Sequence, residues 1–117
     1  MNKKIGIGID IVNINNFSKK PYQTNQSFYK KIFNNSEIKY CVKYKDPYPH
    51  FAVKFALKEA TIKAINKKIT LHNIITYYSL SKPQIRIKNI KNEYRFIVSA
   101  SHEKNYAIGI VISESRM

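Results

Sequence analysis

Residues 50–66 read HFAVKFALKEATIKAIN and carry the strongest helix pattern in the chain. Alanine recurs at every fourth position from 52 to 64, so one face of this helix is smooth and allows close packing. The neighbouring stripe consists of Phe51, Phe55, Glu59 and Lys63. Since the alanine face and the two phenylalanines are apolar, we expect the helix to lie against the core of the protein.

Residues 5–12 read IGIGIDIV and alternate strictly, which predicts a β-strand. The isoleucines at 5, 7, 9 and 11 face one side of this strand. Gly6, Gly8, Asp10 and Val12 face the other side. That second face is nearly bare of side chains up to Asp10, so another backbone or a ligand can approach it closely.

The rest of the chain predicts an α+β fold, in which an N-terminal strand is followed by helices and then by antiparallel strands. Residues 13–25 are polar and rich in turn formers. Helices are expected at 26–32 and 37–45, the second capped by Ser36 and ended by the prolines of residues 46–49. Strands are expected near residues 74–78, 84–88, 94–100 and 107–112, with turns at 81–83 and 91–92.

The composition describes one domain that spans residues 1–117. Hydrophobic residues make up 44% of the chain, which excludes a wholly disordered protein. No apolar run approaches the roughly 20 residues needed to cross a bilayer, and the N-terminus lacks an export signal, so we expect a cytoplasmic protein. Cys41 is the single cysteine, so we expect a small buried side chain rather than a disulfide or zinc site.

The chain carries 21 basic and seven acidic residues, for a formal charge of +14. The positive electrostatic field of such a chain attracts anionic partners, which include nucleic acid, an anionic membrane, a phosphate-rich cofactor and an acidic protein. Charge alone therefore indicates a class of partners and does not choose among its members.

Asp10 is one of two aspartates and lies within an otherwise apolar strand. A buried carboxylate without a partner is costly, so this residue requires an explanation. It could cap a turn with Asn13 or Asn15, or it could serve a functional site.

Glu59 presents the same problem on the helix, where Lys63 follows it by one turn. The simple interpretation is a surface ion pair between these two residues. If Asp10 and Glu59 both point inward, however, they could share Mg²⁺, which takes one or two carboxylates and completes its shell with water and phosphate oxygens. Three lysines on or flanking that face would balance phosphate charge: Lys54, Lys58 and Lys63.

Three separated blocks together resemble the holo-[acyl-carrier-protein] synthases, the short class of 4′-phosphopantetheinyl transferases. The blocks are residues 6–12, GIGIDIV; residues 51–64, FAVKFALKEATIKA; and residues 99–102, SASH, followed by a terminal apolar strand. Lys82 and Pro83 match a smaller feature of the family. The resemblance covers essentially the whole chain and keeps the order of the blocks.

This resemblance implies an enzyme of fatty acid biosynthesis that moves the 4′-phosphopantetheine arm of coenzyme A to a serine of an apo carrier protein, releasing adenosine 3′,5′-bisphosphate. It implies that Asp10 and Glu59 hold Mg²⁺ against the pyrophosphate and that Lys63 stabilises the leaving phosphate. The other residues implied to bind coenzyme A are Lys54, Lys58, Lys82, Pro83, Ser101 and His102. The general base stays open between Glu59 and a water.

The family also implies a homotrimer with coenzyme A between neighbouring subunits, and an acidic acyl carrier protein as partner. Two arginines common in the family are Asn16 and Lys54 here, and its glycine-rich turn after the helix is Asn66-Lys67-Lys68. Two other readings remain to be tested. One is a small basic RNA-binding protein whose tyrosines stack on bases, and the other is an inactive homologue that only binds carrier protein.

Overall fold

The computed structural model describes residues 4–90 and 93–116. In chain order the elements are β1 (Ile5–Asn13), α1 (Asn15–Ser18), η1 (Tyr22–Thr24), α2 (Gln26–Ile32), α3 (Asn35–Val42), α4 (Tyr48–Ile65), η2 (Leu71–Asn73), β2 (Ile74–Ser79), β3 (Lys82–Ile87), β4 (Tyr94–His102) and β5 (Tyr106–Ser115). The expected α+β class and the order of strand, helices and antiparallel strands are confirmed.

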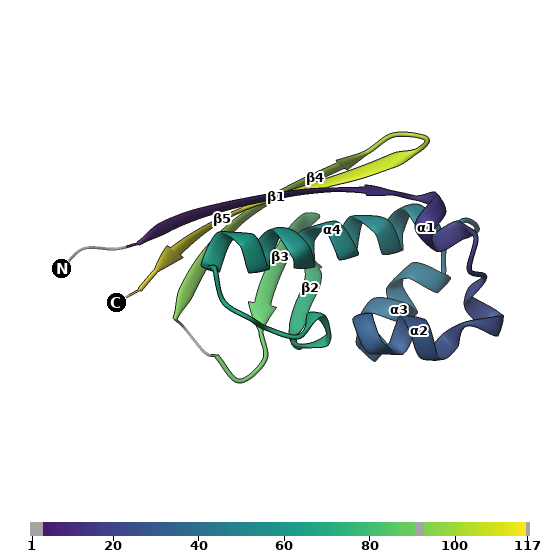
Figure 1. Cartoon of the computed structure of the whole chain (residues 1–117), viewed down its shortest axis with the longest axis horizontal. Helices are drawn as coiled ribbons and strands as arrows, with labels where there is room; N and C mark the ends of the chain where they lie inside the picture. The colour runs from purple at the N-terminus through teal and green to yellow at the C-terminus, as the bar shows by residue number, and fades with distance from the viewer. Residues whose placement is uncertain (1–3, 91–92, 117) are drawn as a thin grey trace.

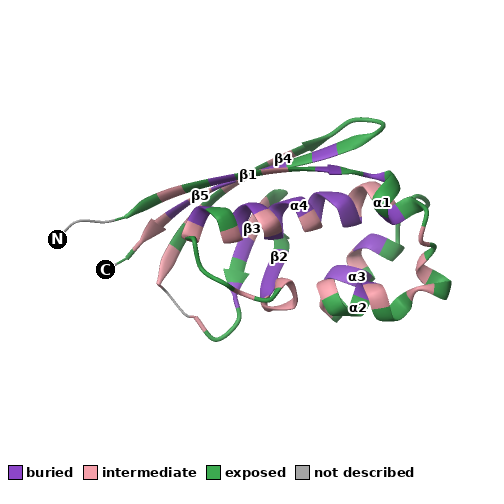
Figure 2. Cartoon of the chain, in the orientation of Figure 1, coloured by how far each residue is buried: buried purple, intermediate pink, exposed green. Residues whose placement is uncertain are grey.

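The strands form two antiparallel sheets, one of order β1-β5-β4 and one of β2 and β3. Helix α4 lies beneath the larger sheet, while the β2–β3 hairpin and helices α2 and α3 lie on the other side of the helix (Figure 1). This central position explains why α4 is the most continuously buried element (Figure 2). Aromatic rings fill the space between α4 and the N-terminal helices, with Tyr29 and Phe51 at 4.6 Å between ring centroids.

The predicted bareness of β1 is confirmed, because its glycines lie directly against α4. A Cβ added at Gly6 would overlap the carbonyl oxygen of Ala64, and one added at Gly8 would overlap that of Ala60. The alanine face of the helix therefore packs on the glycine face of the strand at a distance that larger side chains would forbid.

The isoleucine face of β1 points away from α4 and is open. Ile5, Ile7, Ile9 and Ile11 are between 54% and 65% exposed. Pairing places Ile108 beside Ile11 on the same face, and it is 36% exposed. The larger sheet thus has one face in the core and one apolar face without cover in this single chain.

Several predicted boundaries are wrong at the ends of helices. Helix α3 is capped by Asn34 rather than Ser36, because Asn34 and Glu37 form a reciprocal capping box. Helix α4 begins at Tyr48, with Pro49 inside its first turn, where a helix needs no amide donor. Residues 13–25, expected as turns, contain α1 and η1, since burial of Phe17 holds α1 against the core.

The hairpin turn also differs from the prediction. It consists of Leu80 and Ser81, both with positive φ, as a tight two-residue turn requires. Lys82 and Pro83 open β3 instead of forming the turn, and proline is tolerated because this two-stranded sheet consists of edges. The turn predicted at residues 91–92 lies outside the described residues.

Candidate active site

Asp10 and Lys63 meet where β1 crosses α4. The Lys63 ammonium lies 3.2 Å from Asp10 Oδ1 and donates a hydrogen bond to the backbone carbonyl of Ile9 at 3.0 Å. The Asp10 side chain is 17% exposed and that of Lys63 is 54% exposed, so the pair faces solvent on one side. Asp10 therefore does not cap the following turn. Asn13 does so, accepting a hydrogen bond from the amide of Asn15.

Glu59 lies close enough to this pair to be affected by both members. Burial raises the pKa of the Glu59 carboxyl, the Asp10 carboxylate raises it further, and the Lys63 ammonium lowers it. The Asp10–Lys63 pair thus lies within electrostatic range of Glu59, whereas the simple prediction was an ion pair between Glu59 and Lys63. The tight contact between Gly8 and Ala60 brings together the two segments that carry these acids, since Gly8 lies two residues before Asp10 and Ala60 directly follows Glu59.

The carboxylates of Asp10 and Glu59 suit a hard divalent cation whose coordination shell is completed by a substrate. Within residues 4–90 and 93–116, no cluster of three or more His, Cys, Asp or Glu side chains is arranged to hold a metal. Mg²⁺ commonly needs only one or two protein carboxylates, with phosphate oxygens and water in the remaining positions. Two partly buried carboxylates with mutual repulsion therefore fit an ion that arrives with a phosphorylated substrate.

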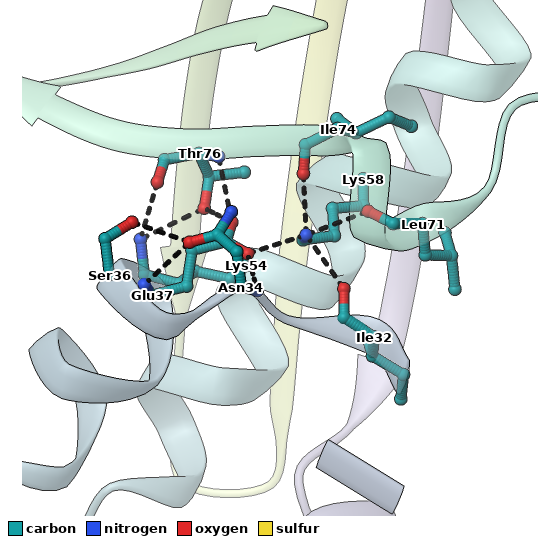
Figure 3. A network of polar contacts seen from close by, with 9 residues as sticks. All are labelled: Ile32, Asn34, Ser36, Glu37, Lys54, Lys58, Leu71, Ile74 and Thr76. Carbon is teal, nitrogen blue, oxygen red and sulfur yellow. Dashed lines mark hydrogen bonds and ion pairs between the residues drawn. The ribbon is translucent and has the colours of Figure 1, made fainter. Parts of the chain in front are cut away.

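Lys58 lies elsewhere, and the prediction that it flanks the acidic face is wrong. Its ammonium is fully buried, 2.7 Å from Glu37 Oε1. It also donates to three backbone carbonyls, those of Ile32, Leu71 and Ile74, at 2.9, 2.9 and 2.6 Å (Figure 3). With its donors occupied inside the protein, Lys58 joins α4 to its neighbours and has no group left to offer a phosphate.

Glu37 connects this ammonium to Lys54, which is also enclosed. Glu37 Oε2 accepts hydrogen bonds from the amide and hydroxyl of Thr76, at 2.8 and 2.6 Å. Lys54 donates to the same hydroxyl at 3.0 Å (Figure 3). Its ammonium also lies 4.8 Å from the centre of the Tyr40 ring. Only 2% of Lys54 is exposed, so its predicted phosphate-binding role has no support in this arrangement.

His102 ends β4 as predicted and is exposed, as is Ser101. Its ring lies 6.3 Å from that of His50 in the first turn of α4. At about 1.5 Å per residue, His50 is some 13 Å along the helix from Glu59. Lys82 and Pro83 open β3, exposed and half-buried respectively. The structure therefore spreads the residues expected to bind coenzyme A along α4 instead of gathering them at the acids.

An aromatic stack beside His102 was missed in the sequence. His50 lies flat on Tyr44, with ring centroids 3.7 Å apart and planes 16° from parallel. Burial and then His102 lower the pKa of His50; Asp46 raises it, and Lys54 and Lys43 each lower it by less than Asp46 raises it. Neither residue has a motif spacing, so only the close approach of α3 to α4 could have revealed the pair.

Comparison with known proteins shows the family of this chain. The model of the 4′-phosphopantetheinyl transferase superfamily matches residues 6–111. A holo-[acyl-carrier-protein] synthase of Thermodesulfovibrio yellowstonii is 37% identical over 92% of this chain and 96% of its own length. One from Ehrlichia ruminantium is 39% identical over 92% of this chain and 94% of its own.

Solved structures are similar over nearly the same range. The Helicobacter pylori holo-[acyl-carrier-protein] synthase in complex with coenzyme A is 31% identical, with a TM-score of 0.79 over 92% of this chain and 98% of that one. The Bacillus anthracis enzyme, in complex with CoA (3′,5′-ADP), is 27% identical, with a TM-score of 0.80 over 94% and 96%. The ordered motifs, the fold and these relatives agree, and the chain belongs to the 4′-phosphopantetheinyl transferase superfamily.

Proposed function

We propose that this protein is a holo-[acyl-carrier-protein] synthase, which transfers the 4′-phosphopantetheine arm of coenzyme A to a serine of apo acyl carrier protein. The observation that carries the proposal is the Asp10–Lys63 ion pair at the crossing of β1 and α4, with Glu59 within electrostatic range of both. Two carboxylates and an ammonium at one half-open place suit a pyrophosphate and its cation. The relatives named above carry the same activity in their names.

In the proposed reaction, the serine hydroxyl oxygen attacks the phosphorus that bears the arm. A new serine O–P bond forms, and the P–O bond to the nucleotide breaks, so adenosine 3′,5′-bisphosphate leaves. Asp10 and Glu59 would hold Mg²⁺, which when bound neutralises charge on the phosphoryl oxygens. Lys63, which is more than half exposed, can turn its ammonium toward the leaving phosphate.

Either Glu59 or a water beside the cation would accept the serine proton. His102 and Ser101 would lie on the nucleotide side of the site, with Lys82 and Pro83 as further contacts. Lys54 and Lys58 are left out of this set because they are enclosed by protein groups.

The open isoleucine face supports a homotrimer. A continuous apolar surface on a monomer marks an interface, and Ile5, Ile7, Ile9 and Ile11 form one along the whole of β1. Copies of this chain would cover it and could border the active site. An Ile9→Lys substitution, which places a charge at its centre, should therefore lower the molecular mass measured by sedimentation.

The charge of +14 suits an acidic carrier protein, because attraction between oppositely charged proteins speeds their association and orients them as they meet. We propose a cytoplasmic location for this reaction. In the part of the chain that the structure describes, no helix has the length and apolarity needed to cross a membrane.

The test is to incubate the protein with coenzyme A, Mg²⁺ and apo acyl carrier protein, and to measure the mass gained by the carrier. Asp10→Ala and Glu59→Ala should each abolish the gain and weaken Mn²⁺ binding measured by electron paramagnetic resonance. Asp46→Ala, which removes an exposed aspartate at another place, is the matched control and should remain active. Transfer that is unaffected by both site variants would contradict the proposal. RNA binding without transfer would support the RNA-binding alternative, and carrier binding without transfer would indicate an inactive homologue.

A further inference from the structure

A cavity with a volume of about 440 Å³ lies between the first turn of α3 and the β2–β3 hairpin. It is separate from the candidate active site, because Asp10, Glu59 and Lys63 form no part of its wall. Cavities of roughly 300–1,000 Å³ hold small ligands, so this one has room for more than a single ion. The lining includes Asn34, Ser36, His72, Ile75, Arg86 and Lys88.

Basic side chains from one wall of the cavity converge on it. Arg86 in β3 and Lys88 just after that strand both line the cavity, and both are exposed. Strand pairing places Ile75 of β2 beside Arg86, and His72 lies in η2 just before β2. The Lys88 amide donates to the carbonyl of Asn73 at 2.8 Å, which holds Lys88 beside the residue that follows His72. The hairpin wall therefore carries two permanent cations and an imidazole.

No carboxylate lines this cavity within the described residues. Glu37 follows Ser36 directly in sequence, but its oxygens are already held inside the protein. Its Oε1 lies 2.7 Å from the Lys58 ammonium, and its Oε2 accepts hydrogen bonds from the amide and hydroxyl of Thr76. Since no acid on the wall balances Arg86 and Lys88, the cavity favours a ligand that brings negative charge of its own.

The opposite wall adds hydrogen-bond donors from α3. The Glu37 amide is bonded to Asn34 Oδ1, whereas helix geometry leaves the amides of Asn35 and Ser36 without an acceptor in the helix. The positive end of the helix dipole lies at the same place. The side-chain amide nitrogen of Asn34 is buried and has no hydrogen-bond partner in the part of the chain that the structure describes. Because an unpaired buried donor is costly, this wall favours a ligand with acceptor oxygens.

We propose that this cavity is a second anion site, which binds an oligophosphate apart from the candidate active site. Arg86 and Lys88 would balance the charge of the phosphates, and His72 would donate a ring N–H. The amides of Asn35 and Ser36 would donate to a phosphate at the helix N-terminus. Two walls that both offer donors suit a chain of phosphate groups better than one phosphate. The ligand would thus join α3 to the hairpin.

The test is a titration of the protein with inorganic triphosphate in the absence of Mg²⁺, followed through its backbone amide signals by nuclear magnetic resonance. We expect saturable shifts at the amides of Asn35, Ser36 and Ile75, since these groups line the cavity or its helix wall. The melting temperature should rise as the cavity fills, because the ligand binds only the folded protein. A parallel titration with adenosine triphosphate distinguishes a free oligophosphate, bound equally well, from one carried by a nucleotide, bound more tightly.

Lys88→Ala and Arg86→Ala should each weaken the affinity at these signals about tenfold, because each removes a charged hydrogen-bond donor. Lys63→Ala is the matched control, since it removes the same charge from the candidate active site and should leave the affinity at the cavity unchanged. All three side chains are at least half exposed or lie on the surface, so melting temperatures equal to that of the wild type without ligand would show that the variants are folded.

Shifts that do not saturate, or that spread over the whole lysine-rich surface, would overturn the proposal in favour of unspecific attraction. An equal loss of affinity in folded Lys63→Ala and Lys88→Ala would overturn it as well. The titration uses neither coenzyme A nor carrier protein, so its failure would leave the proposed function untouched.

Discussion

The substitution Gly8→Ala tests whether close contact between β1 and α4 assembles the active site. The added methyl would overlap the carbonyl oxygen of Ala60 and lie 2.8 Å from both the Ala60 carbonyl carbon and the Ala64 nitrogen. Optimal contacts between carbon atoms are about 3.5–4.0 Å, so strand and helix must separate by roughly an ångström. Because all three contacted atoms are backbone, no change of side-chain rotamer can relieve the overlap.

Overpacking of this kind costs about 1–3 kcal/mol, which in a domain of this size lowers the melting temperature by roughly 5–15 °C. The same displacement moves Asp10 relative to Glu59, since each lies within two residues of the clash. Misplacement of reacting groups by about an ångström can cost about 100-fold in rate. We therefore expect Gly8→Ala to lose about two orders of magnitude in transfer at a temperature where it is still folded.

Gly109→Ala is the matched control, because it adds the same methyl on β5 against the same helix. There the nearest atom is Leu57 Cδ2 at 2.9 Å, the end of a side chain, followed by the Leu57 nitrogen at 3.0 Å. Both variants would be compared by thermal unfolding and by the mass gained by apo carrier protein. Unchanged activity in Gly8→Ala, or equal damage in Gly109→Ala, would refute the argument that this contact positions the acids.

Three further changes test the electrostatics. Lys58→Met leaves Glu37 charged and without its ion-pair partner in the core, so we expect the free energy of unfolding in urea to fall by about 3–5 kcal/mol. Adding Glu37→Gln should recover part of this loss, and no recovery would contradict the ion-pair explanation. Glu59→Gln should abolish transfer yet raise the unfolding free energy at pH 7 by up to about 1 kcal/mol. The pKa of Glu59 is raised in the folded protein, so the ionised carboxylate destabilises the fold above that pKa. The stability gained by Glu59→Gln should therefore vanish as the pH falls below the ordinary pKa of 4.5, and a gain that persists at lower pH would contradict this explanation. The pKa of His50 is lowered in the folded protein, so the wild type should lose stability as the pH falls below 6.5. His50→Phe keeps an aromatic ring against Tyr44 and should lose less stability over the same range, and identical pH profiles would contradict this role of His50.

Local patterns predicted the elements that assemble the site. The alternation of residues 5–12 predicted both the strand and its bare glycine face, and the four-residue spacing of alanine predicted the smooth face of α4. These two features are complementary surfaces, so their contact was a reasonable inference from the sequence. Helix α2 was predicted with its observed limits, because Pro21 and Asn25 precede it and a new turn follows.

The directions of the lysines could not be obtained in the same way. Successive residues of a helix point about 100° apart, so Lys58 and Glu59 had to face different neighbours, but the pattern does not say which. The Lys58 ammonium is enclosed because it donates to the backbone carbonyls of Ile32, Leu71 and Ile74, which lie up to 26 residues away in sequence. Lys54 is enclosed for the same reason, by Thr76 and the ring of Tyr40.

The sequence alone determined the order of the main elements and the motifs of the family, and it predicted the two acids of the site, because each motif consists of residues near one another in the chain. The tertiary structure decided that Lys63 reaches Asp10, that Lys54 and Lys58 serve the interior, and that a cavity lined by cations lies between α3 and the β2–β3 hairpin. These facts depend on the distance between segments far apart in sequence. Side-chain burial and pairing are set by that distance, and periodicity within a single segment contains no information about it.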